Sequence, residues 1–191
     1  MWANEVLNGL NIEKTYSDMS ESSCVGICQW TRVSSTQLRF EGVIKPGSES
    51  EFKEKVNEDI REIILNSGGG SVRVALEIAK EIERRNLNVT VNDFCISSCA
   101  NYLFLAGKVK RINGLVGFHG SVGALNDYNC TKKQSDAACK IMLDEQYFFK
   151  RTGISNKLFD ITQSDSKGMD DGHVYAYYAP SSQVLHDLGV R

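Results

Sequence analysis

Several features that mark common protein classes are missing or scarce in this chain of 191 residues. No apolar run approaches the roughly 20 residues that a membrane-spanning helix needs, so we expect no membrane span. The charges nearly balance, with 22 Lys and Arg residues against 24 Asp and Glu residues. Nucleic-acid-binding domains usually carry a strong positive excess, so we expect no nucleic-acid partner.

Proline and histidine are also rare, with two and three copies respectively. The histidines lie far apart at positions 119, 173 and 186, and the cysteines lack the short spacing of thiolate zinc sites, so the pattern does not favour a metal. The remaining composition is 41% hydrophobic and 24% charged, which is ordinary for a globular protein. The chain is long enough to bury a core of its own, and we expect a single domain over residues 1–191.

Cysteine is the residue type whose distribution is most unusual. The six cysteines lie in three close pairs: Cys24 and Cys28, Cys95 and Cys99, and Cys130 and Cys139. This grouping favours one disulfide within each pair over free buried thiols and over a metal site. Disulfides are typical of oxidising compartments, so the cysteines predict an extracytoplasmic location. No basic, then apolar leader precedes the polar N-terminal residues, so this expectation rests on cysteine alone.

The hydrophobic pattern alternates between strand and helix periods along the chain. Strands are expected over 37–44, 63–65, 87–91 and 115–118, with a β-like run over 174–178. Helices are expected over 50–60, 72–85, 99–105 and 136–151, and near 183–185. Strands that alternate with helices predict right-handed βαβ units and a mainly parallel α/β sheet.

Three candidate chemical groups each follow a predicted strand. They are the glycine turn 68–70, the serine pair Ser97 and Ser98, and His119. Parallel sheets place ligands at the carboxyl ends of their strands, so these groups are expected to converge. A hydroxyl, a glycine turn with exposed N–H groups and an imidazole are the parts of a serine hydrolase. Taken singly, each has a simpler interpretation: a tight turn, a helix N-cap and a structural histidine.

At these residues the chain resembles the Clp protease proteolytic subunit superfamily, which has the ClpP/crotonase fold of repeated ββα/βαβ units. Residues 66–72 (Asn-Ser-Gly-Gly-Gly-Ser-Val) are similar to the family's Asn-Ser-Pro-Gly-Gly-Ser-Val, with Gly68 in the proline position. The family's nucleophile precedes a glycine by nine positions, and counting back from Gly107 selects Ser98 over Ser97. The resemblance covers about residues 36–190 and leaves residues 1–35 as an N-terminal extension with a cysteine pair.

The resemblance implies a serine peptidase that cleaves a peptide or protein substrate and needs no metal or organic cofactor. Ser98 would be the nucleophile, His119 the general base, and Asp171, or Asp170 as the weaker choice, the acid. The N–H groups of Gly70 and Cys99 would form the oxyanion hole, with Gly69 beside them. The family also implies a homo-oligomer. A Cys-x-x-x-Cys segment around the serine is similar to a ClpP-like group of bacterial extracytoplasmic proteins, which implies a periplasmic location.

Two other functions remain open at the level of sequence. Direct alignment from Gly189 places Tyr177, and not an acid, at the family's third catalytic position. A site without an orienting acid would suit a catalytically inactive scaffold or binding protein. A crotonase-type acyl-CoA enzyme shares the fold, but it needs a glutamate base, and no glutamate follows a predicted strand near the glycine turn or Ser98.

Overall fold

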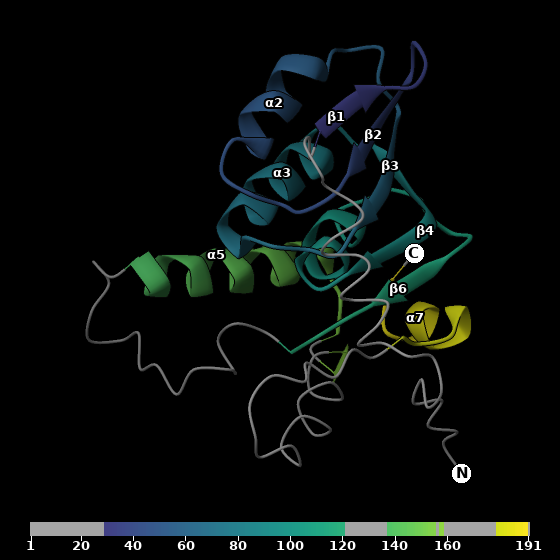
Figure 1. Cartoon of the computed structure of the whole chain (residues 1–191). Coiled ribbons are helices and arrows are strands. Elements are labelled where there is room, and N and C mark those ends of the chain that lie inside the picture. Colours follow the sequence, from purple (N-terminus) through teal and green to yellow (C-terminus); the bar gives the residue numbers. More distant parts are fainter. Residues whose placement is uncertain (1–28, 121–136, 156, 159–178, 191) are drawn as a thin grey trace.

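A computed structural model describes residues 29–120, 137–155, 157–158 and 179–190 (Figure 1). Its centre is a six-stranded sheet in the order β1-β2-β3-β4-β5, with β6 also paired to β4. The strands are β1 (Gln29–Arg32), β2 (Gln37–Glu41), β3 (Glu62–Ser67), β4 (Asn88–Ile96), β5 (Lys110–Ile112) and β6 (Leu115–Gly117). Only the β1–β2 pair is antiparallel among these described strands.

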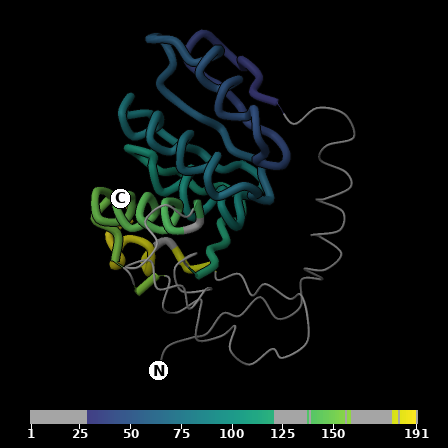
Figure 2. Tube along the Cα trace, turned by 90° about the vertical axis from the view of Figure 1, so that its left-hand side faces the viewer, coloured from purple at the N-terminus to yellow at the C-terminus, as the bar shows by residue number. Residues whose placement is uncertain are grey.

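The described helices are α2, α3, a short π-helix η1, α5 and α7. Their bounds are Ser48–Lys55 for α2, Val72–Arg84 for α3, Cys99–Phe104 for η1, Ala137–Thr152 for α5 and Ser182–Asp187 for α7. Figure 1 shows α2 and α3 side by side against the sheet, with α5 passing below α3. The view turned by 90° agrees: β1 and α2 lie at one end of the molecule, and α5 and α7 lie at the other (Figure 2).

The central strands β3 and β4 are buried over three consecutive residues each, and part of each run lies in the main core. Ile63 and Leu65 of β3 are fully buried, and the register pairs Ile63 with Leu38 of β2 and Val89 of β4. Helix α3 covers this face with an apolar stripe, and its Ile78 is also fully buried. The apolar side chains of α3 and β3 remove each other from water, and this burial of apolar surface is the main stabilising contribution in layered structures.

The mostly parallel α/β architecture expected from the sequence is confirmed. Each helix and strand expected within the described residues is present, with shifted ends. The largest shifts are in α2, which ends at Lys55, and in β4, which continues to Ile96. β4 is long because it pairs with β5 through residues 89–91 and with β6 through residues 94–96. The expected β-like run 174–178 lies outside the described residues.

Two strands were missed from the sequence, and one of them corrects the expected N-terminal extension. Residues 29–32 form β1, so they belong to the sheet and not to an extension. Their alternation is too short to recognise, yet Trp30 is fully buried, with its ring 4.9 Å from that of Phe40 and 4.4 Å from that of Phe52. The second missed strand, β5, has only three residues and two of them are basic.

Candidate functional site

The glycine turn joins the carboxyl end of β3 to the start of α3. Gly69 and Gly70 have φ values of 94° and 139°, which L residues rarely adopt. A Cβ on Gly70 would lie 2.2 Å from the carbonyl oxygen of Ile44, and a Cβ on Gly69 would lie 2.7 Å from the Cβ of Ser97. Glycine is therefore required at both positions, by backbone conformation and by close approach.

The serine pair forms the turn between β4 and η1. Ser97 has a positive φ of 58°, and its N–H donates to the carbonyl of Gly117 on β6 at 3.0 Å. Cys95 and Cys99 flank the turn and are joined by a disulfide, with their Cα atoms 5.3 Å apart. The disulfide ties the end of β4 to the start of η1, so the strained residue is held from both sides.

Ser98 occupies the N-cap position of η1 without acting as a cap. Its side chain accepts no hydrogen bond from the helix. The hydroxyl donates instead to the carbonyl of Gly70, at 2.9 Å and across 28 residues of sequence. The simplest interpretation of this serine, a helix N-cap, is therefore wrong, and tertiary structure brings its hydroxyl to the glycine turn.

Backbone hydrogen bonds pair the glycine turn with Ile44. Gly69 O accepts from Ile44 N at 2.7 Å, and Ser71 N donates to Ile44 O at 2.8 Å. The Gly70 carbonyl accepts from the Ser98 hydroxyl, so the glycine turn is held between the Ile44 segment and the serine.

Two N–H groups belong to residues that lie beside Ser98 and were expected to form the oxyanion hole. One is the Gly70 N–H, and the other is the N–H of Cys99 in the first turn of η1, where helices leave N–H groups without an intrahelical acceptor. The Gly69 N–H differs, because it donates to the Ser67 hydroxyl at 3.1 Å. Gly69 therefore serves close packing beside the serine turn.

His119 follows β6 and is mostly buried. Burial lowers the pKa of its imidazole, and a contact with the carbonyl of Gly120 partly opposes that effect. The contact is made by Nδ1, which holds a proton when it donates to a carbonyl. Nε2 is then the basic nitrogen of the neutral ring. Ser98 and His119 are both described residues, and no hydrogen bond joins their side chains in this structure.

Asn101 is a residue of the site that the sequence did not indicate. It lies on η1 three positions after Ser98 and is fully buried. Its Nδ2 donates to the carbonyl of His119 at 3.0 Å, and its Oδ1 accepts from the His119 N–H at 3.3 Å. The sequence feature that could have pointed to Asn101 is a polar residue within the otherwise apolar run 99–105, because a buried amide needs hydrogen-bond partners.

A second buried contact fixes η1 to α5. The Tyr102 hydroxyl donates to the carboxylate of Glu145 at 2.6 Å, and both side chains are almost completely buried. Burial and the neighbouring carboxylate raise the pKa of Tyr102 well above its usual value, so the hydroxyl stays protonated. The Tyr102 ring also packs on those of Phe148 and Phe149, at 6.0 and 6.1 Å. The helix that begins with Ser98 is thus held along its length.

Other expected site residues lie outside the described part of the chain. Asp170 and Asp171 are among them, so the acid of the site stays a prediction. The same holds for the Cys24–Cys28 pair and for Cys130. Cys139 is disulfide-bonded, but its pairing with Cys130 likewise stays a prediction. Within the described residues there is no group of three His, Cys, Asp or Glu side chains that suits a metal ion.

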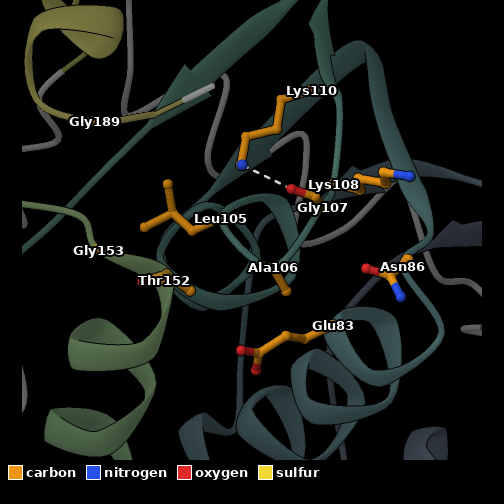
Figure 3. Close-up of a pocket in the computed structure, with 10 residues that line it drawn as sticks. All are labelled: Glu83, Asn86, Leu105, Ala106, Gly107, Lys108, Lys110, Thr152, Gly153 and Gly189. Atoms are coloured by element: carbon orange, nitrogen blue, oxygen red, sulfur yellow. Dashed lines mark hydrogen bonds between the residues drawn. The ribbon is translucent and has the colours of Figure 1, made fainter.

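A cavity of about 460 Å³ lies at the other end of η1 (Figure 3). Lys110 lines it and donates from Nζ to the carbonyl of Gly107 at 2.7 Å. The register places Lys110 beside the buried Val89, and burial lowers the pKa of the lysine to about 8. Ser98 and His119 do not line this cavity, so it is separate from the candidate site.

Comparison with known proteins supports the architecture. No protein-family model matches the sequence, and neither does any curated protein. Among solved structures, the fold is that of ClpP protease subunits. An N165D mutant of ClpP1 from Listeria monocytogenes aligns with a TM-score of 0.53 at 16% identity, covering 82% of this chain and 88% of its own. The ClpP protease catalytic domain from Plasmodium falciparum aligns with a TM-score of 0.52 at 15% identity, covering 82% of each chain.

The chain therefore has a ClpP-like fold, as the resemblance implied. At these identities the likeness concerns the fold and does not extend to activity. In the described part of the chain, no helix is long and apolar enough to cross a membrane.

Proposed function

We propose that this protein is a serine peptidase that hydrolyses peptide bonds with Ser98 as nucleophile and His119 as general base. The observation that carries the proposal is the position of the Ser98 hydroxyl. It starts a helix without capping it and instead donates to the carbonyl of Gly70 in the glycine turn. A nucleophile beside an amide donor at a helix N-terminus is the arrangement that acyl transfer requires.

The proposed reaction begins when the substrate displaces the hydrogen bond between Ser98 and Gly70. Exchanging one neutral hydrogen bond costs about 0.5–1.5 kcal/mol, which is small beside the chemical barrier. His119 Nε2 takes the hydroxyl proton while Oγ attacks the peptide carbonyl carbon. The negative charge that develops on the carbonyl oxygen is stabilised by the N–H groups of Gly70 and Cys99.

The second half of the reaction regenerates the enzyme. His119 returns the proton to the leaving amine, and the C–N bond breaks to leave an ester on Ser98. A water molecule, deprotonated by His119, then hydrolyses this ester. Asp171, or Asp170 as the weaker choice, is proposed to orient the imidazole. This mechanism uses no metal and no organic cofactor.

Partners and location are part of the same proposal. The ClpP-like fold supports self-association into a homo-oligomer that acts on peptide or protein substrates. The disulfide that flanks Ser98 and the bonded Cys139 support an oxidising, extracytoplasmic compartment, periplasmic in a bacterial cell.

A catalytically inactive ClpP-like scaffold or binding protein is the second candidate. The observation in its favour is that Ser98 is almost fully buried and is not hydrogen-bonded to His119, so the described site is not poised for attack. Catalytic hydrogen bonds often tighten only when substrate binds. Chemical labelling therefore separates the two candidates better than the resting geometry does.

The decisive experiment is labelling of the folded, oxidised protein with a fluorophosphonate probe, followed by peptide mass spectrometry. We expect one adduct on Ser98, abolished in Ser98→Ala and strongly reduced in His119→Ala. Ser97→Ala is the matched control, because it removes the adjacent hydroxyl and should retain the adduct. Absence of any adduct on folded wild-type protein would favour the scaffold. Acyl-CoA binding without an adduct would favour a crotonase-type enzyme.

A further inference from the structure

Asn101 makes the closest set of side-chain contacts to His119 among the hydrogen bonds of the described residues. Its amide spans both main-chain polar groups of the histidine, with Nδ2 3.0 Å from the carbonyl oxygen and Oδ1 3.3 Å from the nitrogen. Nδ2 also lies 3.4 Å from Nδ1 of the imidazole. The two main-chain contacts determine which end of the amide faces which group, since the N–H requires an acceptor and the carbonyl a donor.

The same residue is fixed relative to Ser98. The Asn101 N–H donates to the carbonyl of Ser97 at 2.9 Å, and the side chain is fully buried. Ser98 and Asn101 both belong to the first turn of η1, which is held by the Cys95–Cys99 disulfide at its start. The chain of contacts from the nucleophile to the histidine main chain therefore contains no exposed or loosely held residue.

We propose that Asn101 is the positioning residue of the site: it holds the main chain of His119 at a fixed place relative to Ser98, while the Gly120 carbonyl holds the Nδ1 proton. This inference rests on the proposed function for its effect on catalysis. Asn101 acts through His119 and does not contact the substrate. An acid such as Asp171 would share the Nδ1 proton with the Gly120 carbonyl, while Asn101 places the backbone that carries the ring.

The first test replaces Asn101 with aspartate, which has the same shape but no N–H donor. A carboxylate oxygen would then face the carbonyl oxygen of His119, and we expect the histidine to shift. Misplacement of a catalytic group by about 1 Å costs on the order of 100-fold in rate. We expect the maximal rate of fluorophosphonate labelling at Ser98 to fall by about that factor. The probe concentration at half-maximal rate should change little, because substrate contacts are untouched.

The matched control is Asn113→Asp. Asn113 is an exposed asparagine whose Nδ2 also donates to a neighbouring oxygen, that of Asn92, at 3.0 Å. It lies before β6 and makes no contact with Ser98 or His119, so the labelling rate should equal that of the wild type. Because Asn101 is buried, Asn101→Ser serves as the second variant if the aspartate variant loses its cooperative unfolding transition, with the same expected outcomes.

A readout independent of activity comes from nitrogen NMR of the imidazoles. The chain has only three histidines, and the His119 signals are assigned by their loss in His119→Gln. In the wild type we expect one neutral tautomer with the proton on Nδ1; in Asn101→Asp we expect a mixture. If the wild-type protein takes no label but Asn101→Asp still shows the tautomer mixture, the proposed function is refuted and the positioning role remains. A wild-type spectrum in folded Asn101→Asp would overturn the positioning role, whatever the labelling rate.

Discussion

Removing the disulfide between Cys95 and Cys99 should weaken the protein modestly and the site strongly. The bond closes a loop of five residues, counted from a sequence separation of 4. In the chain-entropy relation, a loop of this size contributes about 2 kcal/mol to the free energy of unfolding. For a chain of 191 residues this corresponds to a fall in Tm of about 4–8 °C in the variant Cys95→Ala/Cys99→Ala.

The effect on the site follows from the backbone of Ser97, which lies inside this loop. Its φ of 58° costs a residue with a side chain about 1–2 kcal/mol, and the disulfide helps to hold that conformation. When the bond is absent, this strain favours a relaxed turn in which Ser98 is displaced. Since about 1.4 kcal/mol is a factor of ten, we expect roughly tenfold slower fluorophosphonate labelling.

The assay compares Tm and labelling rate in the alanine double variant rather than in reduced wild-type protein. Reductant would also attack the bond of Cys139. Adding Ser97→Gly to the double variant should recover most of the labelling rate, because glycine adopts positive φ without cost. Wild-type labelling in the double variant, or no recovery with the added glycine, would refute this reasoning.

Two further predictions concern the glycine turn and the histidine. Gly70→Ala should lower the free energy of unfolding by at least about 2 kcal/mol and abolish labelling, because its Cβ would meet Ile44 O at 2.2 Å. Gly68→Ala is the control: its Cβ meets nothing within 4 Å, so the free energy of unfolding should change by less than about 0.5 kcal/mol. Equal effects of the two variants in thermal melts would contradict the close approach at Gly70. Burial lowers the pKa of His119 from 6.5, so the neutral base persists to lower pH. The labelling rate should therefore fall with decreasing pH with a midpoint below 6.5, and a midpoint above 6.5 would contradict the dominance of burial and indicate an acid beside the imidazole.

The alternation of strands and helices was readable from the sequence because hydrophobic periodicity is local. The apolar stripe of α3 has a clear helical period, and the continuous apolar triplet of β3 is typical of a parallel strand buried on both faces; both elements are present as expected. β1 was not readable, because four residues with one buried tryptophan carry no period. The tryptophan is placed by the rings of Phe40 and Phe52, which come from other elements.

The count from Gly107 selected Ser98 over Ser97, and the structure supplies a physical reason for that spacing. A Cβ on Gly107 would lie 2.8 Å from a methyl group of Val89, so the end of η1 packs directly on β4. That contact fixes the helix along the strand and, with it, the residue that begins the helix. The identity of the acid was less accessible, since it depends on where residues 170–171 lie relative to His119.

The sequence by itself determined the order of the parts: a strand and a glycine turn, a strand and a serine, a strand and a histidine. Local periodicity and the conformational freedom of glycine are sufficient for that. Tertiary structure alone decided that the Ser98 hydroxyl meets Gly70 across 28 residues and that Asn101 holds His119 across 18. These contacts depend on the register of β3, β4 and β6, and no local pattern in the chain specifies how neighbouring strands align.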